Sequence, residues 1–541
     1  MTKSPPLRRY LVNVDSASTP TVSTDCAVIG AGIAGLRAAI EAAEHCNVIV
    51  LCKGSFEESN TWNAQGGIAS VLDETDTFES HIADTLKAGC GICDEAVVEM
   101  VVRQGPQLVR QLLEWGTRFD TDNGRIATTL EGGHSHARVA HAHGDETGKI
   151  IAQTLIDKVT QNPRVQVIEH FFVIDLLSGR NNECIGLIGR DSSGNLRIVR
   201  SASTILATGG AGQLYRETTN PQVATADGIA TAYRAGAVLA DLEMMQFHPT
   251  TLYIAGASRA LVTEALRGEG AVLVDKNGRA FMKQYHPDAE LAPRDIVSRA
   301  ILSHMLKTNS THVYLDARRF DKRHFKKRFP HIFELCESFD IDVARDLIPV
   351  RPSAHYMIGG VKVDRSAATS VRNLYACGEV ACTGLHGANR LGSNSLLEGL
   401  VFGRIAGRSA VGNLKTAAHP AEEAIEYRVP DSGRSRLDTA DVRNSLRALM
   451  WRNVGITRTH RALAEAREII EFWQRYVMDK VFGSPQGWEC QNMLTVALLM
   501  AQAAQMRRES RGVHYRSDFP QTDDEQFKKH IEISRPPDIL G

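Results

Sequence analysis

The feature that most constrains the fold of this chain is an apolar segment that runs into a glycine-rich turn near the N-terminus. Residues 26–29 are Cys-Ala-Val-Ile, and residues 30–35 follow as Gly-Ala-Gly-Ile-Ala-Gly. Helix-forming residues then occupy 36–44, and a second apolar segment occupies 47–52. Strand, glycine turn, helix and strand within about 30 residues form the opening of a dinucleotide-binding unit. The sequence therefore predicts a Rossmann-like α/β domain.

Each glycine of this turn has its own physical role. Gly30 permits the tight turn, Gly32 lets the backbone approach a pyrophosphate, and Gly35 allows the helix to pack closely on the strand. The helix N-terminus adds free N–H groups and the positive end of the helix dipole. The carboxylate that usually ends the second strand of an NAD-binding unit is missing, because residues 51–53 are Leu-Cys-Lys. This disfavours a simple NAD-dependent enzyme.

Two later apolar segments also end in glycine turns, at residues 203–210 and 373–378. With the first segment they predict one nucleotide-binding domain assembled from distant parts of the chain, with an insertion between them. From about residue 427, apolar residues follow helical spacing with many Arg and Glu between them. The predicted parts are 1–241 and 357–426 for the α/β domain, 242–356 for an inserted α+β domain, and 427–541 for an all-α C-terminal domain.

Charge and composition argue against nucleic acid or a membrane as partner. Lys and Arg total 62 against 63 Asp and Glu, so the formal net charge is −1 and any anionic ligand has to be held by local cations. No run of about 18 apolar residues occurs. Residues 1–22 lack the apolar core of a signal peptide. The ten cysteines are scattered, as in a reducing compartment, and the expected location is the cytoplasm.

Two patterns suggest metal or redox chemistry, and each has a simpler explanation. Residues 131–143 contain four histidines, but their spacing does not match common zinc sites and no cysteine completes a ligand set. Cys90 and Cys93 form a C-x-x-C pair without the strand that precedes a thioredoxin-like motif. We therefore expect neither a bound metal nor a catalytic dithiol.

A glycine-rich approach to a helix occurs late in the chain, within residues 383–398. Ser395 and Glu398 match a capping box, which predicts that a helix begins there. A helix start preceded by Gly, Asn and Arg390 presents free N–H groups to an anion, either a reduced flavin ring or a substrate carboxylate. The alternative is an ordinary capped helix. The polar segment 59–68 is equally open, as the lining of a flavin edge or as a surface loop.

Polar and cationic residues beside Gly or Pro recur in and around the inserted segment, as in many substrate-binding loops. They are His248, Thr263, Glu264, Arg267, Arg294 and His355. A lone His or Arg of this kind usually has a structural role. Two His, two Arg and a Thr would clamp two carboxylates if they converged.

Together these motifs resemble the flavoprotein family of succinate dehydrogenases, fumarate reductases and L-aspartate oxidases. The resemblance extends from about residue 24 to about residue 519. Its most specific motifs are the Gly30 turn, Ala-Gln-Gly-Gly at 64–67, His248-Pro, Thr-Glu-Ala-Leu-Arg-Gly-Glu-Gly at 263–270, Pro-Arg-Asp at 293–295, His355-Tyr and His-Gly-Ala-Asn-Arg at 386–390. The resemblance implies a Rossmann-like FAD-binding domain, an inserted capping domain and a helical C-terminal domain, with FAD as cofactor.

Two positions favour the L-aspartate oxidase branch of that family. Succinate and fumarate enzymes usually carry a histidine, covalently joined to FAD, where this chain has Asn60, so the resemblance implies non-covalent FAD. They also usually carry an apolar residue where this chain has Glu131. A carboxylate there would accept a hydrogen bond from the ammonium group of aspartate. With succinate it would remain buried and unpaired, at a cost of about 1–3 kcal/mol or more, so Glu131 is predicted to select the substrate.

The resemblance also implies roles for individual residues. One substrate carboxylate would meet His248 and Thr263, and the other would meet His355 and Arg390. Arg294 resembles the proton-transfer arginine of the family, supported by Glu264 and Arg267; its role is a hypothesis, because the pKa of arginine exceeds about 12. The residues implied in FAD binding are Gly30, Ala31, Gly32, Gly35, Lys53, Asn60, Thr61, Gln65, Gly66, Gly67, Thr208, Gly209, Asp227, Glu379, Asn394, Ser395 and Leu396.

The implied reaction is oxidation of L-aspartate to iminoaspartate, the first step of NAD synthesis through quinolinate. Electrons would pass to O2 or fumarate, and a transient contact with quinolinate synthase is expected. The nearest alternative is a soluble fumarate reductase or succinate-oxidising flavoprotein, which Glu131 and Asn60 disfavour. A non-catalytic FAD-binding electron carrier is the other alternative, and it would not need the predicted carboxylate clamp.

Overall fold

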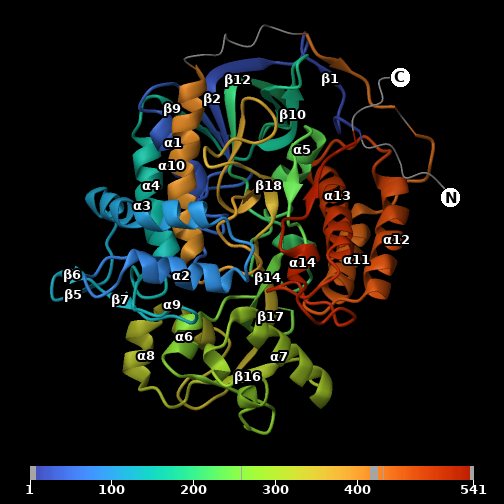
Figure 1. Ribbon diagram of the computed structural model, residues 1–541. Coiled ribbons are helices and arrows are strands. Elements are labelled where there is room, and N and C mark those ends of the chain that lie inside the picture. The colour runs from blue at the N-terminus through green and yellow to red at the C-terminus, as the bar shows by residue number, and fades with distance from the viewer. Residues whose placement is uncertain (1–7, 257–258, 415–423, 431, 537–541) are drawn as a thin grey trace.

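The computed structural model describes residues 8–256, 259–414, 424–430 and 432–536. Figure 1 shows an α/β part around a large sheet, the inserted segment below it, and a group of C-terminal helices at one side. Residues 1–7, which belong to the N-terminal segment 1–22 that is not expected to be a signal peptide, lie outside the described ranges. The predicted fold class is confirmed, whereas the boundaries at 241, 356 and 426 remain predictions.

The α/β part is built on a seven-stranded sheet that joins distant segments of the chain. β12 (Leu196–Leu206) runs parallel to β2 (Thr21–Ile29) and to β19 (Leu374–Ala376). β3 (Val48–Leu51) pairs with β2, also in parallel. Leu206 is in register with the last residues of both β2 and β19. The three glycine turns that follow these strands therefore meet at one edge of the sheet, where ligands bind in such folds.

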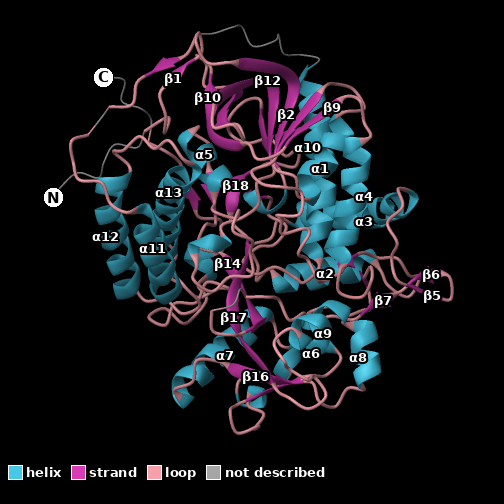
Figure 2. Cartoon of the chain, turned by 180° about the vertical axis from the view of Figure 1, so that it is seen from behind, coloured by secondary structure: helices cyan, strands magenta, loops and turns pink. Residues whose placement is uncertain are grey.

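Two helices lie side by side against this sheet (Figures 1 and 2). They are α1 (Ile33–Ala42) and α10 (Asn394–Leu414). A Cβ built on Gly403 would lie 2.5 Å from the carbonyl oxygen of Ala34, and one on Gly407 would lie 2.6 Å from that of Ala38. The contacts advance along both helices together, so the two helices are parallel. Their N-termini consequently open at the same end of the sheet.

The inserted segment forms a four-stranded antiparallel sheet with its own hydrophobic core. β14 (Met245–Leu252) pairs with β17 (Ile348–Met357), and β16 (Val313–Asp316) joins β17 to β15 (Val272–Val274). Two helices, α6 (Glu264–Gly268) and α7 (Arg294–Thr308), begin at predicted site residues. The long strands β14 and β17 connect this part to the α/β part in both views.

The C-terminal part packs three long helices against the α/β part. They are α11 (Thr439–Asn453), α12 (His460–Val477) and α13 (Pro485–Met506), and all three lie in the region after residue 427 whose apolar spacing predicts helices. Their hydrophobic residues belong to the same core as the main sheet. Within the described ranges, no helix combines the length and hydropathy needed to cross a bilayer.

The remaining helices and strands include β9, β10 and β11, which complete the main sheet. They are β1 (Val14–Asp15), β4 (Ile68–Ala69), α2 (Phe78–Ala88), α3 (Glu95–Glu114), β5 (Thr121–Asp122), β6 (Arg125–Ile126), β7 (Thr128–Thr129), β8 (Val139–Ala140), α4 (Thr147–Thr160), β9 (Val165–Ile168), β10 (Phe172–Ser178), β11 (Cys184–Arg190), α5 (Asp227–Arg234), β13 (Leu239–Ala240), α8 (Lys322–Arg328), α9 (Pro330–Glu337), β18 (Gly360–Lys362), β20 (Ala381–Cys382), β21 (Glu426–Tyr427), α14 (Asp524–Phe527) and β22 (Glu532–Ile533).

Candidate active site

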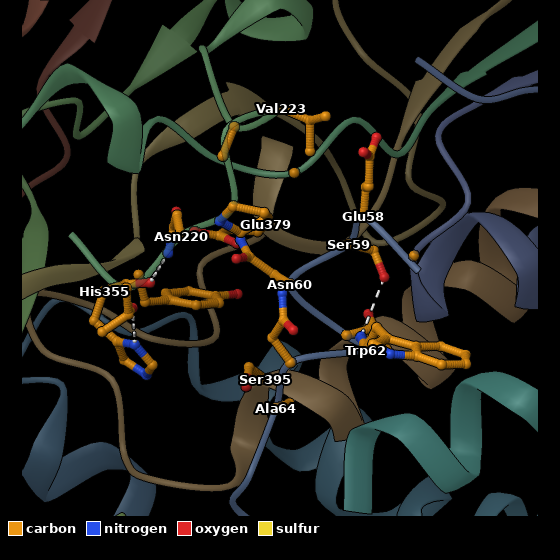
Figure 3. A pocket seen from close by; sticks show the side chains of 18 of the residues that line it. Glu58, Ser59, Asn60, Trp62, Ala64, Asn220, Val223, His355, Glu379 and Ser395 are labelled. Carbon is orange, nitrogen blue, oxygen red and sulfur yellow. Dashed lines mark hydrogen bonds between the residues drawn. The ribbon is translucent and has the colours of Figure 1, made fainter. Parts of the chain in front are cut away.

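A cavity of about 1000 Å³ lies where the glycine turns, the inserted domain and the start of α10 meet. Figure 3 shows part of its wall, with Asn60, His355, Glu379 and Ser395 around the open space. The predicted residues that line it are Gly30, Ala31, Gly32, Lys53, Asn60, Thr61, Gln65, Gly66, Gly67, Glu131, Thr208, Gly209, Asp227, His248, Thr263, Glu264, Arg294, His355, Glu379, Arg390, Ser395 and Leu396. The structure thus brings the predicted cofactor and substrate residues to one cavity.

Three more predicted residues lie behind this wall. A Cβ on Gly35 would lie 2.0 Å from the carbonyl oxygen of Gly30, so only glycine allows this close packing of helix on strand. Arg267 is buried, and its Nη2 lies 3.3 Å from Oε1 of Glu264. Asn394 is buried at the first position of α10. These three residues hold the wall in place.

The N-terminus of α1 forms an anion cradle at the base of the cavity. Gly30 has φ +109°, and a Cβ on it would lie 2.1 Å from the carbonyl oxygen of Ala207. The hydroxyl of Thr61 accepts a hydrogen bond from the Ile33 amide at 3.0 Å. The N-cap residue, Gly32, has no side chain that could cap the remaining N–H groups of the first turn. The first turn therefore leaves N–H groups for a pyrophosphate.

Buried polar atoms without partners indicate that the cavity is built for a polar ligand. Among the described residues, Gln65 Oε1, Thr208 Oγ1, Arg390 Nε and Glu131 Oε1 have no hydrogen-bond partner. Such atoms are costly unless a ligand or water pairs them. All four residues line the same cavity. The phosphate cradle, the volume and these atoms together fit FAD along the sheet edge with a small substrate beyond it.

Lys53 occupies the position where NAD-binding domains usually carry an acid. Its Nζ donates to Asp227 Oδ2 and to Thr225 Oγ1, both at 2.7 Å, and lies 2.7 Å from Glu489 Oε1. Asn492 Nδ2 donates to the other oxygen of Asp227 at 2.7 Å. Lys53 and Asp227 therefore line the cavity while neutralising each other. Glu489 and Asn492, from α13, are residues of this edge that the sequence analysis missed.

Asn60, which the family resemblance aligns with the flavin-linked histidine, faces Glu379 in Figure 3. Asn60 Nδ2 donates to Glu379 Oε2 at 3.0 Å, and the amide of Met357 donates to Glu379 Oε1 at 2.9 Å. Burial raises the pKa of Glu379 to about 7. An amide has no nucleophilic ring nitrogen, so this position holds Glu379 and forms no bond to a flavin.

Two buried histidines face each other at the inner end of the cavity. The rings of His248 and His355 have centroids 5.2 Å apart. The Nδ1 atom of His355 lies 2.9 Å from Thr219 Oγ1, and that of His248 lies 3.0 Å from the Thr250 carbonyl. Burial lowers the pKa of both imidazoles well below the usual value. Nε2 is thus the nitrogen that each ring has left for a ligand.

Glu264 lies between two arginines beside these histidines. Its Oε2 accepts from Nε of Arg294 at 2.6 Å, and Nη2 of Arg294 lies 2.5 Å from the same oxygen. Its Oε1 faces Arg267. Burial acts to raise the pKa of Glu264, but Arg294 and Arg267 outweigh it and lower the pKa. The three predicted catalytic residues therefore form one charged group with a net positive charge.

Arg390 is held from two sides. Its Nη1 donates to Ser395 Oγ at 3.0 Å, and its guanidinium lies 4.4 Å from the ring centroid of Tyr356. Burial lowers its pKa to about 10, which leaves it cationic at neutral pH. This is the arrangement of a cation positioned for a carboxylate.

Glu131 lies near Arg294 and Glu264. Its Oε2 accepts from Ser393 Oγ at 2.8 Å, while Oε1 faces His141 at 3.6 Å. Around Gly392, a Cβ would lie 3.0 Å from Arg294 Nη2 and 3.6 Å from Glu131 Oε2, so the two side chains meet there. Burial and the charge of Glu264 raise the pKa of Glu131. The predicted selector is thus a buried carboxylate beside the residues that are predicted to clamp the substrate.

The predicted capping box at Ser395 and Glu398 is wrong. α10 begins at Asn394, and Glu398 is 1% exposed inside the protein. Its carboxylate accepts hydrogen bonds from Thr383 Oγ1 at 2.6 Å and Tyr356 Oη at 2.8 Å, and lies 3.0 Å from His386 Nε2. Ser395 and Glu398 have the residue types and the spacing of a capping box. The carboxylate of Glu398 nevertheless pairs with side chains from distant parts of the chain, and not with the backbone at the start of α10.

The structure also places the four histidines of residues 131–143 and the C-x-x-C pair. Of the four histidines, His136 and His143 are exposed, whereas His134 and His141 are buried near Glu131. Cys90 and Cys93 are free thiols whose pKa burial raises, to about 11 and about 12. Thiols that hard to ionise are poor nucleophiles.

Comparison with protein families gives two matches along the chain. A model described as "FAD binding domain" matches residues 25–396, and one described as "Fumarate reductase flavoprotein C-term" matches residues 443–538. The L-aspartate oxidase of Yersinia pestis is 42% identical over 523 residues, covering 92% of this chain and 96% of that protein. The L-aspartate oxidase of Streptomyces coelicolor is 40% identical over 537 residues, covering 96% of this chain and 92% of that protein.

Solved structures agree with this result. The flavoprotein of Escherichia coli quinol fumarate reductase superposes with a TM-score of 0.89 at 34% identity, over 96% of this chain and 95% of that one. Mycobacterium smegmatis Sdh1 superposes with a TM-score of 0.82 at 31% identity, over 96% of both chains. The cavity, its phosphate cradle and these relatives lead to one assignment: the chain belongs to the L-aspartate oxidase family of FAD-dependent flavoproteins.

Proposed function

We propose that this protein oxidises L-aspartate to iminoaspartate with non-covalent FAD, as the first step of NAD synthesis through quinolinate. FAD, when bound, supplies the hydride acceptor, and electrons then pass to O2 or fumarate. The observation that carries the proposal is Glu131, a buried carboxylate with an unpaired oxygen beside the carboxylate clamp. A neutral succinate carbon would leave that oxygen unpaired, whereas the ammonium group of aspartate would pair it.

The clamp orients the substrate in this proposal. His248 and Thr263 hold one carboxylate, and His355 and Arg390 hold the other. A dicarboxylate brought between these groups places its Cα at a fixed position in a site from which water is excluded, so the hydride has only a short distance to move. The carboxylates also raise the pKa of both histidines toward the cationic form, which strengthens the clamp.

Arg294, Glu264 and Arg267 act as a unit in this proposal. Glu264 is kept ionised by the two arginines, and it fixes the direction of the Arg294 guanidinium. An oriented cation beside the substrate balances the charge that its carboxylates bring into a buried site. In fumarate reduction, the same arginine is the group placed to move a proton.

A fumarate reductase with the same clamp is the alternative. It would have no use for a buried carboxylate at position 131 facing a carbon that bears only hydrogen. Iminoaspartate hydrolyses readily in water, so a transient contact with quinolinate synthase in the cytoplasm belongs to the proposal as well.

The substitution Glu131→Gln tests the selection directly. It removes the charge that pairs with ammonium and relieves the penalty with succinate. Anaerobic flavin reduction by aspartate is expected to slow about 10- to 100-fold, while reduction by succinate becomes faster than in the wild type. Glu57→Gln, at an exposed position, is the matched control. An unchanged ratio of the two rates in E131Q would contradict the proposal.

A further inference from the structure

Aspartate oxidation requires a proton to leave before the hydride does. The ammonium form of aspartate has no lone pair on nitrogen, so the C=N double bond cannot form as the hydride departs from Cα. One N–H bond has to break first, and a base has to take that proton. In a site closed to water, the base and a route to solvent both have to be supplied by the protein.

Arg294 is poorly suited to take this proton. Its guanidinium is already cationic and is directed at Glu264 through two contacts of 2.5 and 2.6 Å. Glu264 in turn is committed to Arg294 and Arg267, which hold it ionised. The clamp histidines face the carboxylates in the proposed function. Glu131 is the remaining acidic side chain at the substrate end of the lining, and its Oε1 has no hydrogen-bond partner among the described residues.

Behind Glu131 stands a histidine that the proposed function does not otherwise use. His141 Nε2 lies 3.6 Å from Glu131 Oε1, and the two side chains are 4% and 2% exposed. The same Nε2 lies 2.9 Å from Thr129 Oγ1. The backbone of Gly144 also acts on this ring. A buried ring poised between a carboxylate and a hydroxyl is placed to exchange a proton with either of them.

Thr129 leads from this pair to the surface. It belongs to the two-residue strand β7, which pairs with β8 next to His141, and it is half-buried. Leu130, which follows it, is exposed. The atoms Glu131 Oε1, His141 Nε2 and Thr129 Oγ1 therefore form a chain from the cavity wall toward solvent.

We propose that Glu131 takes a proton from the substrate ammonium and passes it through His141 to water at Thr129. This rests on the proposed function, since only an amine substrate has such a proton. The N–H bond breaks and a Glu131 O–H bond forms, which leaves a lone pair on nitrogen. That pair forms the C=N bond as the hydride leaves Cα, giving the iminium. His141 accepts the proton at Nε2 and gives it to water, so Glu131 is ionised again for the next substrate.

The surrounding charges favour Glu131 as the group that takes the proton from the substrate. Glu131 faces Glu264, His134, Arg294 and His141; burial and Glu264 raise its pKa, so it holds a proton readily. The groups that act on His141 are Arg328, Asp120 and Glu269, and burial lowers its pKa to about 4. A neutral ring with a low pKa passes a proton on without storing it.

The substitution His141→Gln tests the route, because glutamine keeps a polar atom near the Nε2 position but does not titrate. Flavin reduction by aspartate is expected to slow about tenfold or more near neutral pH. The defect should shrink about tenfold per pH unit as the fraction of free amine in solution rises. Reoxidation of reduced enzyme by fumarate, which involves no ammonium, should change less than about twofold. His136→Asn, an exposed histidine of the same segment, is the control.

Thr129→Val provides a second variant on the same path, with nearly the same shape and no hydroxyl. It should show a smaller defect of the same kind, confined to aspartate. Equal losses with aspartate and fumarate, or a defect in H141Q that does not vary with pH, would overturn the proposal. Failure of the wild-type enzyme to oxidise aspartate would instead overturn the proposed function.

Discussion

At the scale of single residues, the site depends on how Arg390 is held. Tyr356 presents its ring face to the guanidinium at 4.4 Å, and its hydroxyl donates to Glu398 at 2.8 Å. Glu398 is fixed by Thr383 and His386. The chain of contacts runs from a buried carboxylate through a tyrosine to the arginine, so Tyr356 is a positioning residue for the clamp.

Replacing Tyr356 separates the two contacts. Tyr356→Leu removes the ring, and loss of a buried cation–π contact of about 0.5–2 kcal/mol is expected to weaken fumarate binding roughly 2- to 30-fold. Tyr356→Phe keeps the ring and loses only the hydroxyl, so its binding should stay closer to the wild type. Titration of the oxidised flavin spectrum with fumarate measures both. Equal affinities in wild type and Y356L would show that the ring contributes nothing to Arg390.

How far the sequence could predict the site differs between residues. The role of Glu131 remains a prediction from the family resemblance, and the structure places its side chain, buried, in the wall of the cavity. His141 was visible only as one of four histidines that failed to match zinc spacing. Its partner Thr129 precedes it by twelve positions, and the contact depends on the pairing of β7 with β8. Glu398 was misassigned, because a capping box and a buried hub share the same residue types.

At the scale of secondary-structure elements, α1 and α10 are held unusually close by glycines. Gly399, Gly403 and Gly407 repeat at intervals of four, and a Cβ on each would fall within 2.5–2.6 Å of an atom of α1. The sequence predicted both helices, the first from the helix-forming residues after the glycine turn and the second from a capping box. It did not reveal this interval as a contact surface, because glycine inside a helix also occurs without packing reasons.

The substitution Gly403→Ala therefore tests the packing of the two helices. An added methyl group would meet the Ala34 carbonyl at 2.5 Å and the Arg37 Cβ at 2.9 Å, so the helices have to move apart. The free energy of unfolding should fall by about 1–3 kcal/mol. Gly412→Ala, in the same helix with no atom of the described residues within 4 Å, should leave it unchanged or slightly higher. Urea unfolding at fixed FAD concentration measures both, and equal stabilities would contradict the packing argument.

At the scale of the whole molecule, three parts meet at one cavity and are tied together behind it. Arg507, at the end of α13, donates to Glu243 Oε1 at 2.6 Å and to Glu509 Oε1 at 3.0 Å, and lies 3.4 Å from Asp241 Oδ1. Asp241 and Glu243 lead directly into β14, which carries His248. The arginine-rich end of the sequence thus anchors the strand that enters the substrate site.

Fold class was predictable because strand, turn and helix leave local signals, and three such signals imply one sheet. The convergence of distant side chains on one site could not be predicted from the physics of one sequence. His248 and His355 are more than one hundred positions apart, yet β14 and β17 pair and bring their rings together. Only the resemblance to a family indicated this clamp. The contacts of Glu489 and Asn492, from α13, with Lys53 and Asp227 left no local signal in the sequence, because they depend on how the C-terminal helices pack against the α/β part.

The central claim is that this molecule selects an amine-bearing dicarboxylate. The purified protein with bound FAD is mixed anaerobically with L-aspartate and, separately, with succinate, and the visible flavin band is followed. The account predicts that aspartate bleaches the band about 10- to 100-fold faster than succinate, or more, because succinate leaves a buried carboxylate unpaired. Bleaching by succinate, with aspartate inert, would contradict it and place the protein with the fumarate reductases.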